Sequence, residues 1–393
     1  MQTKISPLYQ QMPYITDIEK ILRSCVHCGF CNATCPTYQI TGNELDGPRG
    51  RIYQIKQILE GENISASAHQ HLDRCLECRN CETTCPSGVE YARLLHFGKQ
   101  LVLPKQPKLI NGLKYLLAQI LAYPSRVMPL LKIGQFFKPL LPKILAKKIP
   151  ISVPIKPKQW QTHQRKMLIL DGCVQSVMTP QTNHHIKTVL DKLAIQVDSV
   201  SGCCGGLHQH LGQPATATIQ QNIDNWLTLL AQEYECFIYS ASGCGLSILK
   251  YPDSFTEGSE YHQKATLLTS KVRDISEVLI QEDLSIFNID KQTANIAFHP
   301  PCTLQHGLKL QGLVEEVLQK IGYSLQPIND AHLCCGSAGP YSILHPKIST
   351  ELVNNKWANI GGVDLVITAN VGCELHLSSA RDIPVKHWIT CFQ

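Results

Sequence analysis

The second half of the chain alternates short apolar, β-branched segments with stretches whose apolar residues recur at helical spacing. The apolar segments cover residues 167–170, 195–200, 237–239, 296–298, 323–328 and 365–368, and the helical stretches include residues 182–193 and 313–321. Apolar runs of this length predict buried strands, and strands that alternate with helices are typical of a parallel, Rossmann-like sheet. We therefore expect an α/β architecture over residues 166–393.

This α/β part contains two copies of one unit. Each copy has a cysteine after its first strand, a Cys-Cys-Gly motif or a close equivalent after its second and a Gly-Cys pair after its third. The matching landmarks lie 129 to 131 residues apart, and an offset this constant indicates an internal duplication. We place the first repeat at residues 166–285 and the second at residues 286–393.

Cysteines that follow parallel strands are expected to gather at the carboxyl edge of the sheet, where α/β proteins bind ligands. They are Cys173, Cys203, Cys204 and Cys244 in the first repeat and Cys302, Cys334, Cys335 and Cys373 in the second. We expect these residues to be metal ligands or redox thiols, with a metal cluster in at least one repeat. The alternatives are a structural or quinone-facing fold without metal and a strained disulfide between adjacent cysteines.

Four other residues of the repeats have weaker claims to a chemical role. His332 and His376 lie near the cysteine motifs and are interpreted as ligands, proton carriers or ordinary structural residues. Cys236 and Cys391 lie apart from the motifs, and we interpret both as incidental.

The first 98 residues carry two cysteine runs that both fit C-x2-C-x2-C-x3-C-P. This is the pattern of bacterial two-cluster ferredoxins, in which the fourth cysteine of each run ligates the other cluster. The spacing therefore assigns cluster 1 to Cys25, Cys28, Cys31 and Cys85, and cluster 2 to Cys75, Cys78, Cys81 and Cys35. A pair of four-thiolate zinc sites is the alternative. Between the runs, residues 46–51 are predicted to form a turn and residues 52–59 a helix.

Charge changes the interpretation of the segment 99–165, which joins the two parts. Residues 91–170 contain fifteen Lys and Arg and no acidic residue, although the net charge of the whole chain is only +5. One apolar helix face is predicted by the spacing of Leu113, Leu116, Leu117, Ile120 and Leu121. Four breaks in the helical pattern are predicted at Pro124, Pro129, Pro139 and Pro142.

This basic connector has three interpretations. It either forms core or linking helices with solvated lysines, or presents a surface to an acidic partner or an anionic lipid. Nucleic-acid binding fits less well because aromatic residues do not alternate with the charges. We expect peripheral docking on a membrane or partner, which replacement of Lys143, Lys147 and Lys148 by Glu would test.

Composition excludes several classes of protein. With 44% hydrophobic and 17% charged residues the chain is expected to be globular. It has no apolar leader and no run of 18 apolar residues, so we expect neither a signal peptide nor a transmembrane helix. In a reducing cytosol its 18 cysteines would then serve metal or redox chemistry rather than disulfides. The chain also lacks a G-x-G-x-x-G fingerprint and a P-loop.

Taken together, the motifs resemble those of the iron–sulfur subunits of bacterial glycolate oxidase (glycolate dehydrogenase). The resemblance covers nearly the whole chain and rests on CVHCGFCNATCPTYQITGNELDGPRGRIYQIKQILEG, HLDRCLECRNCETTCPSGVEY, CTLQHG, HLCCGSAG and ITANVGC. The repeats are also similar to a wider group of Cys-Cys-Gly domain proteins related to heterodisulfide reductase. Members of that group end each repeat with C-x-x-C, whereas this chain has Ser247 and His376 at the second position.

The resemblance implies a helical two-cluster ferredoxin-like domain at residues 1–98, followed by the connector and the α/β repeats. It also implies two [4Fe–4S] clusters, FAD only in partner flavoprotein subunits, and electron transfer from glycolate oxidation to a quinone or another acceptor. No catalytic residue and no nucleic-acid partner are expected in this cytoplasmic, peripherally membrane-associated chain. The alternatives are a subunit of a D-lactate or glycerol-3-phosphate dehydrogenase, a heterodisulfide-reductase-like catalytic subunit, and a membrane-docking adaptor with structural clusters.

Overall fold

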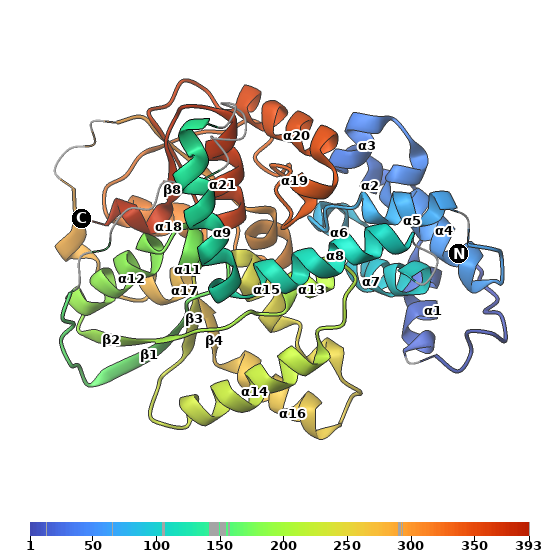
Figure 1. Ribbon diagram of the computed structural model, residues 1–393, viewed down its shortest axis with the longest axis horizontal. Coiled ribbons are helices and arrows are strands. Elements are labelled where there is room, and N and C mark those ends of the chain that lie inside the picture. Colours follow the sequence, from blue (N-terminus) through green and yellow to red (C-terminus); the bar gives the residue numbers. More distant parts are fainter. Residues whose placement is uncertain are drawn as a thin grey trace.

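A computed structural model describes residues 1–12, 14–64, 66–103, 107–140, 149, 155, 158–289, 292 and 294–392. The molecule is elongated, with an all-helical N-terminal part at one end and the two sheets at the other (Figure 1). Of the two connector helices, one runs along the molecule between these parts, and the other runs across the part that contains the sheets.

The N-terminal part is a cluster of short helices around one apolar core. Its helices are α1 (Ile15–Ser24), α2 (Phe30–Ala33), α3 (Pro36–Thr41), α4 (Pro48–Leu59), α5 (Ala66–Asp73), α6 (Asn80–Thr84) and α7 (Tyr91–Val102), with a 3-10 turn η1 (Glu44–Asp46). Leu22, Ile55, Leu59 and Leu94 are fully buried at the centre of the core. Helix α4 begins inside the segment expected to be a turn, because Pro48 occupies a first helical position, which needs no backbone N–H.

Each repeat contains a four-stranded parallel sheet with the same strand order. The first sheet, ordered β2-β1-β3-β4, consists of β1 (Arg165–Leu170), β2 (Ile195–Val200), β3 (Phe237–Tyr239) and β4 (Val272–Asp274). The second, ordered β6-β5-β7-β8, consists of β5 (Ile296–His299), β6 (Leu325–Gln326), β7 (Leu365–Thr368) and β8 (Val385–His387). The identical order confirms the predicted parallel sheets and the duplication.

Helices and helical turns connect these strands. The first repeat contains α11 (Gln175–Met178), α12 (Gln181–Lys192), α13 (Gly206–His210), α14 (Thr216–Leu230), α15 (Ser242–Leu249), η4 (Pro252–Ser254), α16 (Glu260–Ser270), α17 (Ile275–Leu279) and η5 (Ser285–Phe287). The second contains η6 (Thr303–Gly307), α18 (Leu313–Lys320), α19 (Tyr341–Leu344), α20 (Pro346–Asn359), α21 (Val371–Ala380) and η7 (Trp388–Cys391). One apolar core includes Ile169 and Ile238 of the first sheet together with Phe298 and Trp388 of the second repeat. The two repeats therefore form one body.

Three strands differ from the sequence expectation. Strands β4 and β8 were not expected, because each has only three residues and the middle one is an exposed base, Arg273 or Lys386. Strand β6 is much shorter than the expected segment 323–328, since it lies at the sheet edge and only Leu325 and Gln326 pair with β5.

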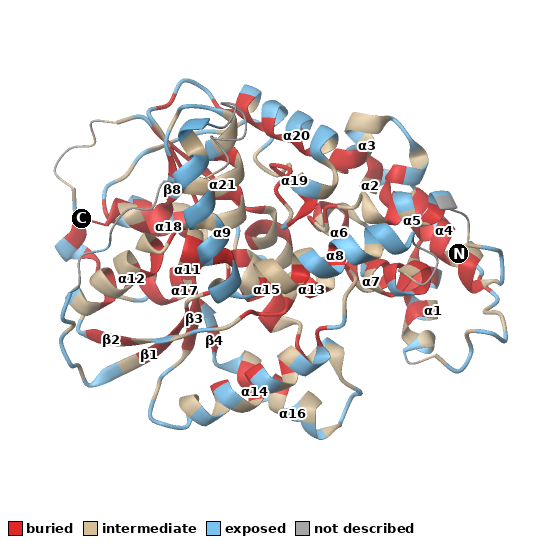
Figure 2. Cartoon of the chain, viewed as in Figure 1, coloured by how far each residue is buried: buried red, intermediate tan, exposed pale blue. Residues whose placement is uncertain are grey.

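The connector contains α8 (Lys108–Leu121), α9 (Pro124–Phe137) and the turn η3 (Lys138–Leu140). Helix α8 lies against α13 and helix α9 against α11, and both carry long exposed stretches (Figure 2). Pro124 starts α9, as expected for a break, but the expected break at Pro129 is wrong because this proline lies inside α9. Its ring removes one hydrogen bond, to the carbonyl four residues earlier, and the helix continues. Pro142, Lys143, Lys147 and Lys148 lie outside the described residues.

Within the described part of the chain, no helix has the length and apolar character needed to cross a membrane.

Candidate metal centres

The first candidate centre is a cavity near the start of the chain that is lined by cysteines of both runs. Cys25, Cys28, Cys31, Cys81 and Cys85 line it, so the structure brings together all four cysteines assigned to cluster 1. The first run curls around the cavity because His27 and Gly29 both have left-handed backbone conformations (φ 56° and 84°). Burial raises the pKa of the Cys31 thiol to about 11, so metal binding there must displace the thiol proton.

The second candidate centre is an adjacent cavity. Cys35, Cys75, Cys78 and Cys81, the four cysteines assigned to cluster 2, line it together with Tyr91. The second run repeats the backbone of the first, with Glu77 and Arg79 in the left-handed region (φ 55° and 60°). Four convergent sulfur atoms in each of two adjacent cavities are a donor set suited to a pair of iron–sulfur clusters.

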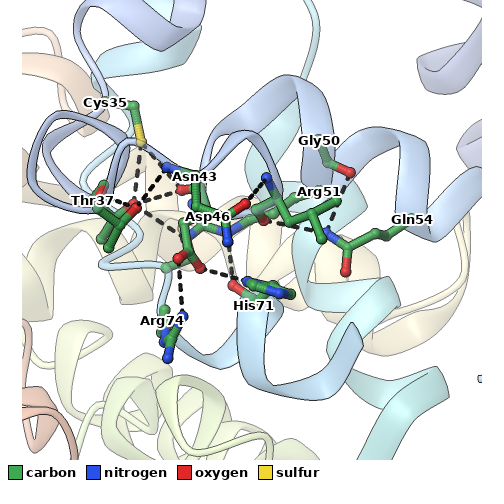
Figure 3. Close-up of polar contacts among 12 residues, drawn as sticks. Cys35, Thr37, Asn43, Asp46, Gly50, Arg51, Gln54, His71 and Arg74 are labelled. Atoms are coloured by element: carbon green, nitrogen blue, oxygen red, sulfur yellow. Dashed lines mark hydrogen bonds and ion pairs between the residues drawn. The ribbon is translucent and has the colours of Figure 1, made fainter. Parts of the chain in front are cut away.

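A network of buried charges lies next to Cys35, one of the cysteines that line the second cavity (Figure 3). Asp46, which is fully buried, contacts His71 Nδ1 at 2.7 Å and Arg74 at 2.9 Å. Arg51, with 1% of its surface exposed, donates to the His71 carbonyl at 2.7 Å and to Thr37 Oγ1 at 3.1 Å. The Thr37 hydroxyl lies 3.2 Å from Cys35 Sγ, so the network reaches one sulfur of the second cavity.

Further hydrogen bonds reach another sulfur of this cavity. The backbone N–H of Glu77 donates to Cys75 Sγ at 3.4 Å, and the Tyr91 hydroxyl donates to the same atom at 3.7 Å. Burial is the main cause that holds the pKa of Tyr91 well above its usual range, so its hydroxyl keeps its proton. Such donors stabilise negative charge on sulfur.

Glu77 also fixes the second run to the rest of the molecule. Its carboxylate is buried and pairs with His96, Lys99 and His210. His210 belongs to the first repeat, and its Nδ1 lies 3.2 Å from the Glu77 carboxylate. Burial alone would raise the pKa of Glu77, but the charges of His210, Lys99 and His96 hold it well below its usual range. One carboxylate thus joins α7, the cysteine run and α13.

The second cavity adjoins the second repeat. Cys78 and Leu76 belong to one apolar cluster with Cys334, Tyr341 and Leu352 of that repeat. Helix α3 lies against α20 and helix α6 against η6. Across this boundary Thr83 Oγ1 lies 3.1 Å from His306 Nδ1, and Asn80 donates to the His332 carbonyl at 3.2 Å.

The cysteine motifs of the two repeats have the same local geometry. The glycines of the two motifs, Gly205 and Gly336, have left-handed backbones (φ 82° and 90°), which favour glycine. In each repeat the glycine N–H donates to the sulfur of the first cysteine, Cys203 or Cys334, at 3.4 Å. The repeated loop thus directs a backbone donor at a sulfur.

The structure also brings together the four cysteines of each repeat. In the first repeat, Cys203 contacts Cys173 and Cys204, and Cys204 contacts Cys244. Hydrogen bonds from Cys203 and Cys244 hold the pKa of Cys204 well below its usual range. In the second, Cys302 Sγ and Cys334 Sγ lie 3.9 Å apart, and Asn370 donates to Cys373 Sγ at 3.7 Å. All 18 cysteines carry free thiols, so the structure contains no disulfide between adjacent cysteines.

The histidines singled out from the sequence do not belong to the tightest donor group, whereas an unexpected one does. His376 Nε2 lies 3.1 Å from Ser349 Oγ, and the His332 carbonyl accepts from Asn80 and His306. His299, at the end of β5, was missed because it looks like the last residue of a buried strand. Its ring nitrogen and the sulfurs of Cys335 and Cys373 all lie within 4.8 Å of one another.

Family models match both the helical N-terminal part and the two repeats. Residues 21–89 match the family model of a 4Fe-4S dicluster domain, and residues 167–249 and 296–378 each match that of a cysteine-rich domain. The first match favours iron–sulfur clusters over the zinc alternative.

Three curated relatives illustrate the similarity. The chain is 42% identical to the glycolate oxidase iron-sulfur subunit of Escherichia coli, over 99% of this chain and 98% of the relative. It is 26% identical to a probable glycolate oxidase iron-sulfur subunit of Bacillus subtilis, over 91% and 88%. Lactate utilization protein A of Shouchella clausii is 25% identical but matches only 55% of this chain and 93% of its own length. The extent and level of the first match show that this chain belongs to the family of glycolate oxidase iron–sulfur subunits.

Proposed function

We propose that this chain carries electrons away from a flavin in partner subunits, where glycolate is oxidised to glyoxylate, towards a quinone or another acceptor. The observation that carries this proposal is the contiguity of its cysteine sites. Cys81 lines both cavities of the helical part, and Cys78 of the second cavity packs with Cys334 of the second repeat. The printed name of the Escherichia coli relative supports glycolate as the substrate of the complex.

The proposed ligand sets are those of the sequence assignment. Cys25, Cys28, Cys31 and Cys85 would hold one [4Fe–4S] cluster; Cys75, Cys78, Cys81 and Cys35 would hold the other. When bound, such clusters supply one-electron carriers. The residues of this chain tune them, because Thr37, the Glu77 N–H and the Tyr91 hydroxyl lie near the sulfurs of the second set.

Anaerobic reduction by glycolate tests the electron-transfer role. We expect the complex of this chain with flavoprotein partners to show reduced-cluster EPR signals after glycolate is added, and the isolated chain to oxidise no glycolate. Cys78→Ser should leave flavin reduction intact but slow electron delivery to an added quinone, whereas Cys236→Ser, outside the four sites, should match the wild type. Turnover by the isolated chain, or clusters that stay oxidised beside a reduced flavin, would refute the role.

We further propose that the connector docks the chain on the inner face of the cytoplasmic membrane. The docking surface, here called the α8–α9 surface, consists of the exposed apolar residues Leu109, Ile110, Leu113, Tyr115, Leu116, Tyr123, Met128, Leu130, Ile133, Phe136, Phe137 and Leu140. Leu109, Phe136 and Leu140 are 79 to 86% exposed. Exposed bases, including Lys108, Arg126 and Lys132, accompany them, and a basic apolar surface suits an anionic lipid layer.

Co-sedimentation with phosphatidylglycerol vesicles tests this docking. Each apolar side chain that enters lipid contributes about 1.5–3 kcal/mol. The combined change Leu109→Ser, Phe136→Ser and Leu140→Ser should therefore weaken binding at least about tenfold. Leu267→Ser on α16, which removes an exposed leucine elsewhere, is the control. Unchanged vesicle binding combined with loss of the flavoprotein subunits would show a protein interface instead and overturn the proposal.

A further inference from the structure

A histidine buried in the second repeat has a ring without a hydrogen-bond partner among the described residues. His299 is 1% exposed, and in this part of the chain neither Nδ1 nor Nε2 has such a partner. Leaving a buried polar group unpaired costs about 1–3 kcal/mol, and buried groups without partners are rare. The ring therefore requires a ligand or another chemical explanation.

Two cysteines from different segments lie next to this ring. Cys335 belongs to the Cys-Cys-Gly motif and Cys373 to the first turn of α21, and both are buried. One ligand atom of each and one ring nitrogen of His299 fit within 4.8 Å. Atoms bonded to one metal at about 2.3 Å lie at most about 4.6 Å apart. The three donor atoms are therefore close enough together to belong to one metal centre.

The charge around these residues suits an anionic thiolate site. Lys356 of α20 is 2% exposed, and its ammonium donates to the carbonyls of Asp330 and Ala331 at 2.9 and 3.4 Å. Among the described ion pairs, none involves Lys356. Ala331 lies three residues before Cys334, so the ammonium lies beside the Cys-Cys-Gly loop. A buried cation in this position would offset part of the negative charge of a thiolate–metal site.

The first repeat has no imidazole at the matching position. Cys302 corresponds to Cys173, so His299 corresponds to Leu170, a residue packed in the apolar core of the first repeat. The duplicated unit therefore has a leucine in one copy and a metal-binding side chain in the other. The difference lies at the carboxyl end of β1 and β5, where parallel sheets place their ligand sites.

We propose that His299 is a ligand of an iron–sulfur cluster in the second repeat, together with Cys335 and Cys373. Cys302 and Cys334 supply further thiolates to the same site. The imidazole takes the place of the thiolate that the second position of C-x-x-C, here His376, cannot provide. Because a neutral imidazole in place of a thiolate raises the potential of a cluster, this site favours accepting electrons. Only that direction of transfer rests on the proposed function; the ligand assignment does not.

The test uses the full chain grown with ¹⁵N-histidine, in complex with its partner subunits and reduced by dithionite. Two cubanes contain about eight irons, so the wild type is expected to hold more. Pulsed EPR of the additional signal should show coupling to a histidine nitrogen. His299→Leu, which copies the first repeat, should lose both this coupling and the iron above eight. His376→Leu is the matched control and should keep both.

A second variant covers the case in which His299→Leu does not fold. His299→Cys should keep the additional iron, lose the nitrogen coupling and shift the reduction potential of the site to a lower value. The proposal is overturned if the wild type holds only about eight irons, if its additional signal lacks histidine coupling, or if the coupling survives in His299→Cys. Reduction of the cubanes by glycolate is scored separately, so failure of the electron-transfer role is distinguished from failure of the ligand assignment.

Discussion

Replacement of Arg51 by Met tests whether the buried charge network holds the second cluster site together. The change keeps most of the side-chain volume but removes the hydrogen bonds to the His71 carbonyl (2.7 Å) and to Thr37 Oγ1 (3.1 Å). It also removes a cation 4.0 Å from the fully buried Asp46. Loss of one member of a buried charge pair costs about 3–5 kcal/mol. Because Arg74 still pairs with Asp46, we expect the free energy of unfolding to fall by about 3 kcal/mol.

The same motif offers a matched control. Arg49 lies two residues earlier and pairs with Glu44, but these side chains are 36% and 40% exposed. Exposed ion pairs contribute about 0–1 kcal/mol, so Arg49→Met should change the free energy of unfolding by less than about 1 kcal/mol. The contrast between the two arginines therefore isolates burial from charge.

Anaerobic urea unfolding of the cluster-loaded chain, followed by circular dichroism and by cluster absorbance, measures both effects. Arg51→Met should also release the second cluster at lower urea than the first, because Thr37 loses the donor that positions it beside Cys35. Equal unfolding free energies for the Arg49 and Arg51 variants, or simultaneous loss of both clusters, would refute the reasoning.

Three further predictions address other parts of the molecule. Tyr91→Phe removes a hydrogen-bond donor to Cys75 Sγ. If this bond stabilises the reduced cluster over the oxidised one by about 1 kcal/mol, its loss lowers the potential of the second cluster by roughly 40 mV, measured by an EPR titration. Burial lowers the pKa of His387 to about 4, below its unfolded value near 6.5. The contribution of the neutral ring to the free energy of unfolding is therefore fully present above pH 6.5, and about 3 kcal/mol of it is lost as the pH falls towards 4. His387→Gln should flatten this dependence in urea unfolding at several pH values, and an unchanged slope would contradict it. Gly50→Ala would place a methyl group 2.1 Å from the Glu44 backbone oxygen and lower the free energy of unfolding by about 1–3 kcal/mol. Gly112→Ala, whose methyl group would meet no atom within 4 Å, should not destabilise the chain, and equal melting temperatures of the two variants would contradict this prediction.

The strands and the repeat were predictable because their signals are local. Segments 237–239 and 365–368 coincide with β3 and β7, because largely buried strands need continuous apolar runs. Segment 195–200 coincides with the edge strand β2, in which apolar and polar residues alternate. The two cysteine runs likewise carry their spacing within eleven residues each. By contrast, β4 and β8 are held by neighbouring strands, and their central exposed base conceals them in the sequence.

The environment of the sites could not be predicted because it depends on contacts between distant segments. His299 reaches Cys373 only through the pairing of β5 with β7, and Glu77 reaches His210 only through packing of α13 against the helical part. The apolar face expected on residues 113–121 illustrates the same limit. Periodicity predicts that these residues share one face of a helix but not which surface that face packs against. In the structure Leu113 and Leu116 are exposed, while Lys114 is buried beside Asp73.

Hydrogen-bond donors near the sulfurs of the second cavity affect the potential of the proposed second cluster. In the second cavity, the Thr37 hydroxyl beside Cys35 donates to the Asp46 carbonyl at 2.8 Å, whereas Cys75 accepts from the Glu77 N–H and the Tyr91 hydroxyl. Donors of this kind stabilise the more negative, reduced state of a cluster, and the reduction potential therefore rises. Removal of the Tyr91 donor should therefore lower the potential of the proposed second cluster, whereas a variant that leaves both donors to Cys75 in place should not.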